Sequence, residues 1–371
     1  MSSIFLAIPM AAIIGGAAAL VVACLLVITQ SLHGHHSTDG TIGPQKFHTK
    51  PTPRVGGIAI VAGVLTAYTL AQPRHHDLLR PLLLAGIPAF VFGLAEDLTK
   101  RVSVRARLLA TMACGLLGWA ITGLSIKEVN VVGLDWLLGF TVVSVAFTAI
   151  AVGGIANAIN IVDGFNGLAA GTSAIILGSF AVMAGALGDA DLSAVCLLMG
   201  AAVLGFGLVN WPMGKIFLGD GGAYFVGFAI AWLAVLLMAR HAEISAWAVL
   251  LVCAYPVLEV LFSMVRRRRR NLSTGTADRM HMHSLVKRRV VRFLLPRGST
   301  LLRYSVTGAI MWAAGLIPAA LALHLPGGTS ILITAFVGCA FLYAAVYARI
   351  TQFRWCVGAR TLQVVAPIAS R

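Results

Sequence analysis

Charged residues are scarce in this chain of 371 residues. Only 11% are Asp, Glu, Lys or Arg, whereas 59% are hydrophobic, and the mean hydropathy is +0.90. In soluble globular domains, by contrast, about a quarter of the residues are charged. The composition therefore excludes an ordinary soluble enzyme and predicts a protein that lies largely within a lipid bilayer.

The chain also lacks any cysteine pattern that would bind a metal or form a disulfide framework. Its six cysteines show no Cys-x-x-Cys or other ligand spacing, and most fall inside apolar runs: Cys24, Cys114, Cys196, Cys253, Cys339 and Cys356. Zinc sites and disulfide-rich folds have recognisable spacings. We therefore expect these cysteines to be packing residues.

Long apolar runs make up most of the sequence. Each is close to the roughly twenty residues that an α-helix needs to cross a bilayer, so the pattern predicts an all-α, polytopic membrane protein with a single domain over residues 1–371. The eleven predicted spans are Ile4–Thr29, Val55–Ala71, Pro81–Ala95, Leu108–Leu124, Leu137–Ile155, Leu168–Leu187, Leu192–Trp211, Gly222–Met238, Ala246–Val265, Tyr304–Leu323 and Thr329–Ala348. No basic residue precedes the first run, so we expect a retained span there and not a signal peptide.

Basic residues are distributed unevenly between the predicted loops. With the N-terminus outside, the inner segments hold 24 of the 28 Lys and Arg residues, 12 of them in the basic loop 266–303, which also carries a histidine motif. Cytoplasmic loops are the ones enriched in Lys and Arg. We therefore expect the N-terminus outside and the C-terminus inside. This arrangement explains most of the net charge of +15 without a nucleic-acid partner.

One polar stretch interrupts the apolar runs near the middle of the chain. Asn157, Asn160 and Asp163 follow one another at intervals of three, so on a helix end they would lie along one face. Gly164 and Gly167 then allow a tight turn or close approach of a ligand. Polar residues at membrane depth are costly and indicate function. A hydrogen-bonded cluster between helices, or a plain loop, is the structural alternative.

The predicted topology places every unusual polar stretch on the cytoplasmic side. The stretches are 48–57, 93–101, 157–166, 211–222 and 278–284, and four carboxylates stand at inner helix ends: Glu96, Asp97, Asp163 and Asp220. Carboxylate oxygens suit magnesium, and neighbouring Lys, Arg and His suit phosphate. The combination predicts a magnesium-dependent site for a phosphorylated substrate.

Some of these stretches, and the basic run that precedes the last of them, also have a purely structural interpretation. Arg266–Arg270 could be an anchor on anionic lipid headgroups. Glu96 and Asp97 could be a solvated helix cap with local ion pairs to Lys100 and Arg101. We favour a common site because five polar stretches lie on one face of the membrane.

Residues of the stretches 211–222 and 278–284 also have structural interpretations when taken alone. Phe217 could be a lipid-facing anchor, and Asp220 could be the N-cap of a helix that begins there. His281 and His283 are two residues apart and would not share one face of a helix, which argues against a zinc pair.

Five motifs, taken in order, resemble those of one enzyme family. They are Pro51-Thr52-Pro53-Arg54-Val55-Gly56-Gly57, the pair Glu96-Asp97, the stretch Asn157–Asn166, Phe217-Leu218-Gly219-Asp220, and the loop with His281 and His283. Over nearly its whole length the chain resembles the polyprenyl-phosphate N-acetylhexosamine-1-phosphate transferases, the group that includes phospho-N-acetylmuramoyl-pentapeptide transferase. The resemblance implies transfer of a sugar 1-phosphate from a UDP-sugar to undecaprenyl phosphate, with release of UMP, at the cytoplasmic face of a bacterial inner membrane.

The resemblance also implies roles for individual residues. Asp220 matches the metal-binding aspartate, Phe217 matches an aromatic that stacks on uracil, and Asp97 matches a group that some mechanisms treat as the base for the lipid phosphate. The implied catalytic set is Glu96, Asp97, Asp163 and Asp220; the implied substrate-binding set is Lys50, Asn157, Asn160, Asn166, Lys215, Phe217, Arg279, His281 and His283. The implied cofactor is Mg²⁺ or Mn²⁺, and the implied assembly is a homodimer.

Three departures from the family pattern bear on the sugar. Glu96 replaces an aspartate, Asn166 replaces an aspartate of the muramoyl-pentapeptide enzymes, and Ser284 replaces their third histidine. All three favour the branch that primes O-antigen or other surface polysaccharides with an N-acetylated hexosamine or deoxyhexosamine.

Two other classes of function remain compatible with the sequence. A secondary transporter of nucleotide-sugars or other anions would also need polar helix ends, although its site would lie nearer the bilayer centre. A structural subunit of a polysaccharide export complex would not need four clustered carboxylates. Release of UMP distinguishes the enzyme from both.

Overall fold

The computed structural model describes residues 8–39, 52–271, 280–325 and 328–352. Nearly all of this part of the chain is helical. Its single strand pair is antiparallel, with β1 (Thr38–Asp39) and β2 (Thr52–Pro53) aligned so that Thr38 faces Pro53. The predicted all-α class is confirmed.

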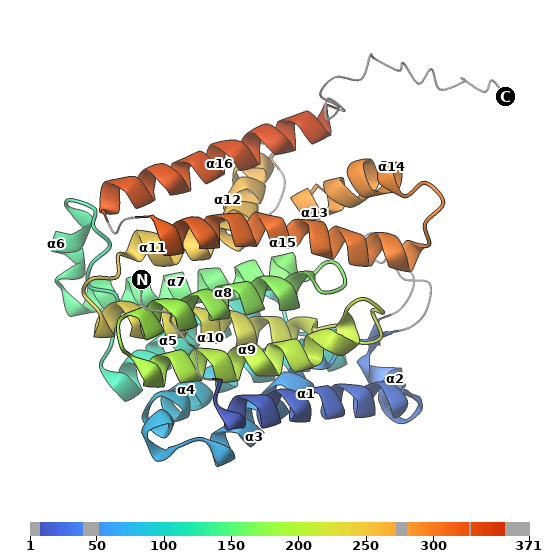
Figure 1. Ribbon diagram of the computed structural model, residues 1–371, viewed down its shortest axis with the longest axis horizontal. Coiled ribbons are helices and arrows are strands. Elements are labelled where there is room, and N and C mark those ends of the chain that lie inside the picture. The colour runs from blue at the N-terminus through green and yellow to red at the C-terminus, as the bar shows by residue number, and fades with distance from the viewer. Residues whose placement is uncertain (1–7, 40–51, 272–279, 326–327, 353–371) are drawn as a thin grey trace.

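The helices run mostly side by side along the long direction of the molecule (Figure 1). In the first half they are α1 (Met10–Ile28), α2 (Gln30–Ser37), α3 (Gly56–Leu70), α4 (Pro73–Thr99), α5 (Val104–Thr122), α6 (Leu134–Leu138), α7 (Thr141–Val162) and α8 (Leu168–Ala186). They continue with α9 (Ala190–Asn210), α10 (Gly219–Arg240), α11 (Ala246–Val252), α12 (Ala254–Arg269), α13 (Met282–Leu285), the π-helical η1 (Val286–Val291), α14 (Arg292–Leu294), α15 (Thr300–His324) and α16 (Thr329–Thr351).

Each of the eleven predicted spans overlaps a helix in the described part of the chain. Nine of these helices are long and apolar enough to cross a membrane alone, and α11 with α12 forms a tenth, broken span. The remaining helix, α3, is apolar but has only 15 residues. The third prediction, Pro81–Ala95, was too short, because α4 extends from Pro73 to Thr99 through two internal prolines. Membrane helices tolerate proline where neighbouring groups satisfy the freed carbonyl.

The ninth predicted span, Ala246–Val265, was wrong in one respect: it is not continuous. The axes of α11 and α12 differ by 82°, and α12 lies across the direction of the other long helices (Figure 1). Pro256 stands in the first turn of α12. It has no N–H to donate to the carbonyl of Val252, the last residue of α11, which weakens the helix at this point and favours the break.

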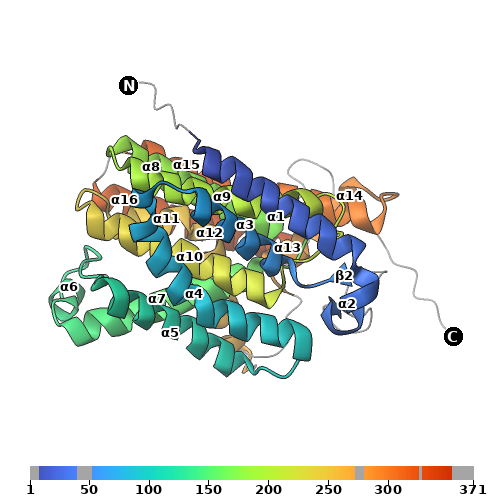
Figure 2. The ribbon, with the colours of Figure 1, turned by 90° about the horizontal axis from the view of Figure 1, so that it is seen from below.

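Helix α10 forms the centre of the bundle. It packs on α3, α4, α7 and α8, and Figure 2 shows it surrounded by other helices. Almost every residue from Gly219 to Leu237 is buried. A helix that is apolar on all sides belongs inside a bundle in this way. Its first turn therefore lies where the ends of several helices meet.

Candidate active site

Glycines bring the backbone of α10 into direct contact with its neighbours. A Cβ added at Gly93 on α4 would lie 2.6 Å from the carbonyl carbon and oxygen of Asp220, and one at Gly57 on α3 would lie 2.4 Å from the amide nitrogen of Gly222. Small residues allow such close helix contacts in membrane proteins. Gly219 adds a positive φ of 73° at the start of α10. These contacts fix the position of the Asp220 backbone.

Asp97 holds the beginning of α10 from the last turn of α4. Its carboxylate oxygens accept hydrogen bonds from the amides of Asp220 and Gly221, both at 2.9 Å. Its side chain is 1% exposed, and Arg54 lies 3.7 Å away. The first amides of a helix have no partner within it and attract negative charge. Asp97 therefore acts as a cap for another helix, and not as the solvated cap of its own.

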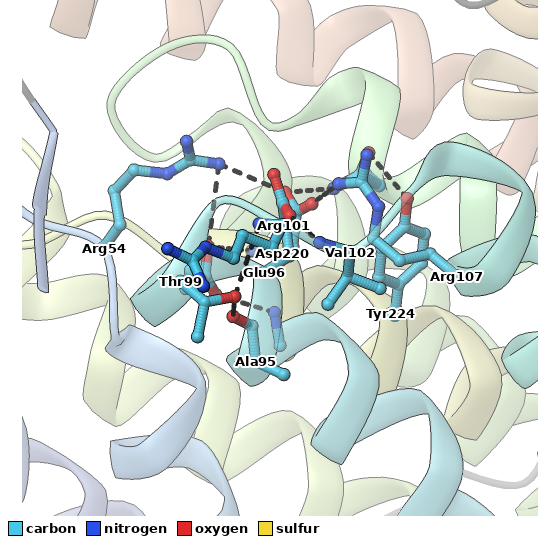
Figure 3. Close-up of polar contacts among 12 residues, drawn as sticks. Arg54, Ala95, Glu96, Thr99, Arg101, Val102, Arg107, Asp220 and Tyr224 are labelled. Atoms are coloured by element: carbon cyan, nitrogen blue, oxygen red, sulfur yellow. Dashed lines mark hydrogen bonds and ion pairs between the residues drawn. The ribbon is translucent and has the colours of Figure 1, made fainter. Parts of the chain in front are cut away.

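Asp220 is the second residue of α10 and not its N-cap. One oxygen accepts hydrogen bonds from Arg54 and from Asn160, each at 3.1 Å. The other oxygen binds the guanidinium of Arg107 (Figure 3). Arg107 also lies over the ring of Tyr224, 6.0 Å from its centroid. A buried carboxylate thus stands between two arginines, which are well suited to bind phosphate.

Asp163 follows the last residue of α7 and faces the same helix end. Burial raises the pKa of its carboxyl to about 6, while the guanidinium of Arg54 and the amide of Gly219 act in the opposite direction. Asn160, one turn earlier, donates to Asp220 and lies 3.4 Å from the hydroxyl of Tyr224. The structure thus brings Asn160 and Asp163, which are neighbours on one helix end, to Asp220, which lies far from both in the sequence.

The histidine loop meets this region from the other side of the 163–167 turn. A Cβ at Gly164 would lie 3.0 Å from Nε2 of His283. The ring of His283 also contacts Phe165, with centroids 5.5 Å apart, and stacks on His281 at 5.3 Å. We expected the two histidines to diverge, but His281 is the extended N-cap of α13, so both rings turn to the same side. The 163–167 turn therefore connects the polar residues around Asp220 with the pair His281 and His283.

Several predicted residues have other surroundings. Glu96 accepts a hydrogen bond from the amide of Val102 at 2.8 Å and closes the loop after α4. Asn166 is buried and donates to Ser305 at 3.2 Å. Lys215 is exposed, and Asn157 is partly buried one turn before Asn160. Lys50 and Arg279 lie outside the described residues.

The backbone of Phe217 is fixed on both sides. Its amide donates to the carbonyl of Pro53 at 2.8 Å, and its carbonyl accepts from the amide of Gly56 at 2.9 Å. The partly buried ring is thus carried on a loop that is bonded to the segment of Arg54.

The sequence interpretation missed four residues of these groups: Arg54, Arg107, Tyr224 and Glu259. Arg54 belonged to a quoted motif, and Arg107 was counted only for topology. Glu259 had a clear signal, since it is the only acidic residue inside any of the eleven predicted spans. Carboxylates in such positions indicate function by default. Nothing in the spacing pointed to Tyr224.

Magnesium is compatible with Asp220 by donor chemistry. Among the described residues, no three His, Cys, Asp or Glu side chains come together as a complete metal site. Mg²⁺ needs no such group, because it commonly takes one or two carboxylates and completes its shell with water and substrate phosphate. Asp220 offers one carboxylate, already bonded to Arg54 and Arg107.

The fold and these contacts define a multi-pass membrane protein with a carboxylate and arginine site at the end of its central helix. Residues 79–238 match the model of glycosyl transferase family 4. The chain is 29% identical to the undecaprenyl-phosphate alpha-N-acetylglucosaminyl 1-phosphate transferase of Yersinia pestis, over 66% of this chain and 68% of that one. It is 28% identical to the probable undecaprenyl-phosphate N-acetylglucosaminyl 1-phosphate transferase of Bacillus subtilis, over 64% and 66%. Over about two thirds of its length the chain is thus similar to polyprenyl-phosphate N-acetylhexosamine-1-phosphate transferases, and the match to the family model lies within its middle part.

Proposed function

We propose that the protein transfers an N-acetylhexosamine 1-phosphate from a UDP-sugar to undecaprenyl phosphate and releases UMP. The relatives are named for this type of transfer. The observation that carries the proposal is the buried Asp220 held between Arg54 and Arg107. Arg107 and Asp220 both lie inside the segment that matches the family model.

The reaction needs charge stabilisation more than it needs a base. An oxygen of the lipid phosphate attacks the β-phosphorus of the UDP-sugar, and the bond from that phosphorus to the oxygen of the α-phosphate breaks. The pair of electrons leaves with UMP. Phosphoryl transfer depends mainly on positioning and electrostatic stabilisation. A phosphomonoester has a second pKa of about 6 and is largely ionised near neutral pH.

This requirement assigns different tasks to the carboxylates. Asp97 has both oxygens bonded to α10 amides, so its task is to position Asp220. Arg54 and Arg107 provide guanidinium groups for phosphate oxygens. Magnesium, or manganese in its place, would be held by Asp220 and would neutralise diphosphate charge.

The nucleotide end and the phosphate end of the substrate would occupy opposite sides of the cluster. Phe217 would stack on the uracil, while His281 and His283 would bind phosphate near the turn at Gly164. Lys50, Asn157, Lys215 and Arg279 remain in the proposed substrate-binding set. Asn166 would act indirectly, because the hydrogen bond from its side-chain amide to Ser305 fixes the turn to α15.

The proposed substrates imply a site on the cytoplasmic face of a bacterial inner membrane. UDP-sugars are cytoplasmic, and the predicted distribution of Lys and Arg puts the site there. We propose N-acetylglucosamine as the first sugar to test, because both named relatives carry it in their names. The three departures at Glu96, Asn166 and Ser284 favour surface-polysaccharide priming. A homodimer is proposed by analogy with the family.

Release of UMP tests the proposal directly. Purified protein is incubated with UDP-N-acetylglucosamine, undecaprenyl phosphate and Mg²⁺, and UMP is measured with time. We expect release that needs the lipid and is abolished by EDTA and by Asp220→Asn, while the variant keeps its yield. UDP-sugar uptake into vesicles without UMP would support the transporter instead. Full activity in EDTA would remove the metal assignment.

A further inference from the structure

A buried carboxylate outside the carboxylate and arginine cluster touches the histidine motif. Glu259 on α12 has no exposed side-chain surface. Its Oε1 lies 2.9 Å from Nδ1 of His281 and accepts the amide of Met282 at 3.1 Å. Its Oε2 accepts the hydroxyl of Tyr343 on α16 at 3.0 Å. The histidine loop and α16 thus converge on one carboxylate of α12.

These contacts are those of a group that orients an imidazole. A carboxylate bonded to Nδ1 fixes the tautomer and plane of the ring and favours its protonated form. The opposite nitrogen, Nε2, then becomes the one that meets a substrate oxygen. His281 also stacks on His283, so holding one ring holds the pair beside Gly164.

The break before α12 allows Glu259 to reach the histidine loop. Because α12 turns by 82° from α11, Glu259 enters the bundle across the direction of the spanning helices. A carboxylate in lipid would be very costly without partners. Here its partners are an imidazole, an amide and a phenol, and they come from the histidine loop and from α16.

We propose that Glu259 is a positioning residue for His281 and keeps this imidazole protonated where it binds substrate phosphate. The proposal rests on the proposed function. It predicts that the negative charge of Glu259, and not only its hydrogen bonds, supports catalysis at alkaline pH.

The neighbouring titratable groups limit the interpretation of a pH profile. Those around Glu259 and His281 in the described residues are Tyr255 on α12, His283 on α13, and Tyr343 and Tyr347 on α16. Arg266 lies beyond them and donates to the carbonyl of Met280 and to Tyr347. The phenols titrate far above neutral pH. Separate variants distinguish the contributions of the two histidines.

The test is kinetic and uses the full-length protein. Glu259→Gln keeps the shape and acceptors of the side chain and removes its charge. We expect kcat for UMP release to fall about 10- to 100-fold at pH 8, part of the 10²–10⁴-fold that a positioned acid or base contributes. The alkaline limb of the plot of kcat against pH should move to lower pH, because the imidazolium of His281 loses the negative charge of Glu259 beside it. Glu259→Asp should keep that limb, and the exposed outer residue Glu243 gives the control Glu243→Gln.

A double variant separates positioning from structural support. In a His281→Gln background, Glu259→Gln should change kcat by less than twofold, because the group it acts through is gone. The proposal would be overturned if the two substitutions reduced kcat independently, so that their effects multiplied in the double variant. It would also be overturned if Glu259→Gln shifted the melting temperature and left the pH profile of kcat unchanged.

A second measurement does not depend on the reaction. Histidine NMR, with His281→Gln to assign the resonance, should show a lower titration midpoint for His281 in Glu259→Gln; an unchanged midpoint overturns the proposal. This readout remains valid if the wild type releases no UMP, a result that would instead refute the proposed function.

Discussion

Asp97 and Asp220 lie next to each other and both face Arg54, but their hydrogen bonds differ. Asp97 binds backbone amides, whereas Asp220 binds arginines and an asparagine. Replacing Asp97 would therefore act through the position of the α10 end. Replacing Asp220 would remove a charge and its ligand chemistry while the helix end stays capped.

Asp163 gives a prediction about pH. Burial raises its pKa to about 6 from an ordinary value of 3.8, which means that the folded protein binds the proton more tightly than the unfolded chain. The carboxylate form is thus disfavoured in the fold, and stability falls as pH rises between these two values. Asp163→Asn should therefore raise the melting temperature at pH 7.5 and change it little at pH 4.5, while reducing activity. Melting curves at both pH values, compared with those of Asp135→Asn in the outer loop, test this; an equal shift at both pH values contradicts it.

Phe217 gives a prediction about substrate binding. Its backbone bonds to Pro53 and Gly56 do not depend on the side chain, so Phe217→Ala should leave the loop in place. Base–aromatic stacking is worth roughly 1–3 kcal/mol, which corresponds to a rise of about 5- to 150-fold in KM for the UDP-sugar. kcat and KM for the lipid should change little, and Phe217→Trp should retain most of the affinity. Phe140→Ala, at the other end of the bundle, is the control. An unchanged KM with a lower melting temperature would instead support a lipid-facing anchor.

The sequence pointed to single candidate residues better than to their partners. Motif spacing led to Asp97, Asn160, Asp163 and Asp220, and the structure brings them to one helix end. Their partners could not be predicted, because Arg54 and Asp220 are separated by 166 positions. Such a contact depends on how whole helices pack.

At the scale of helices, the glycines of α3 and α4 determine where the site forms. Hydrophobic runs predicted the helices, since burial in lipid requires long apolar segments. They did not predict the α11–α12 break, which depends on one proline near a helix start. They also did not show that Gly57 and Gly93 lie against the backbone of α10.

Gly93→Ala tests this contact between helices. The added methyl group would meet the backbone of Asp220, which cannot rotate away as a side chain could. Overpacking of this kind costs typically about 1–3 kcal/mol, and displacing Asp220 should lower kcat at least tenfold. Gly154→Ala on α7 has no atom within 4 Å of the added methyl group and should leave both activity and stability unchanged or improved. Equal behaviour of the two variants would show that the contact is dispensable.

At the scale of the whole molecule, one orientation in the membrane underlies the proposed function. The turn between α7 and α8 and the segment from α13 to α14 lie toward one end of the bundle, and the turn between α8 and α9 lies toward the other (Figure 1). Only one of these ends can face cytoplasmic UDP-sugar.

Cysteine labelling in intact cells decides between the two orientations. In a cysteine-free background, Arg297→Cys at the end of the histidine loop should react only after the membrane is permeabilised. Ala190→Cys, exposed at the start of α9, should react with an impermeant maleimide from outside. Ala190 is preferable to Asp189, which is buried and bonded to Arg240 and His241. Permeabilised cells should label at both positions, which controls for local reactivity. Reversed labelling would place the arginines and carboxylates on the side away from UDP-sugar and would refute the proposed reaction as a whole, whatever the effect of any single substitution.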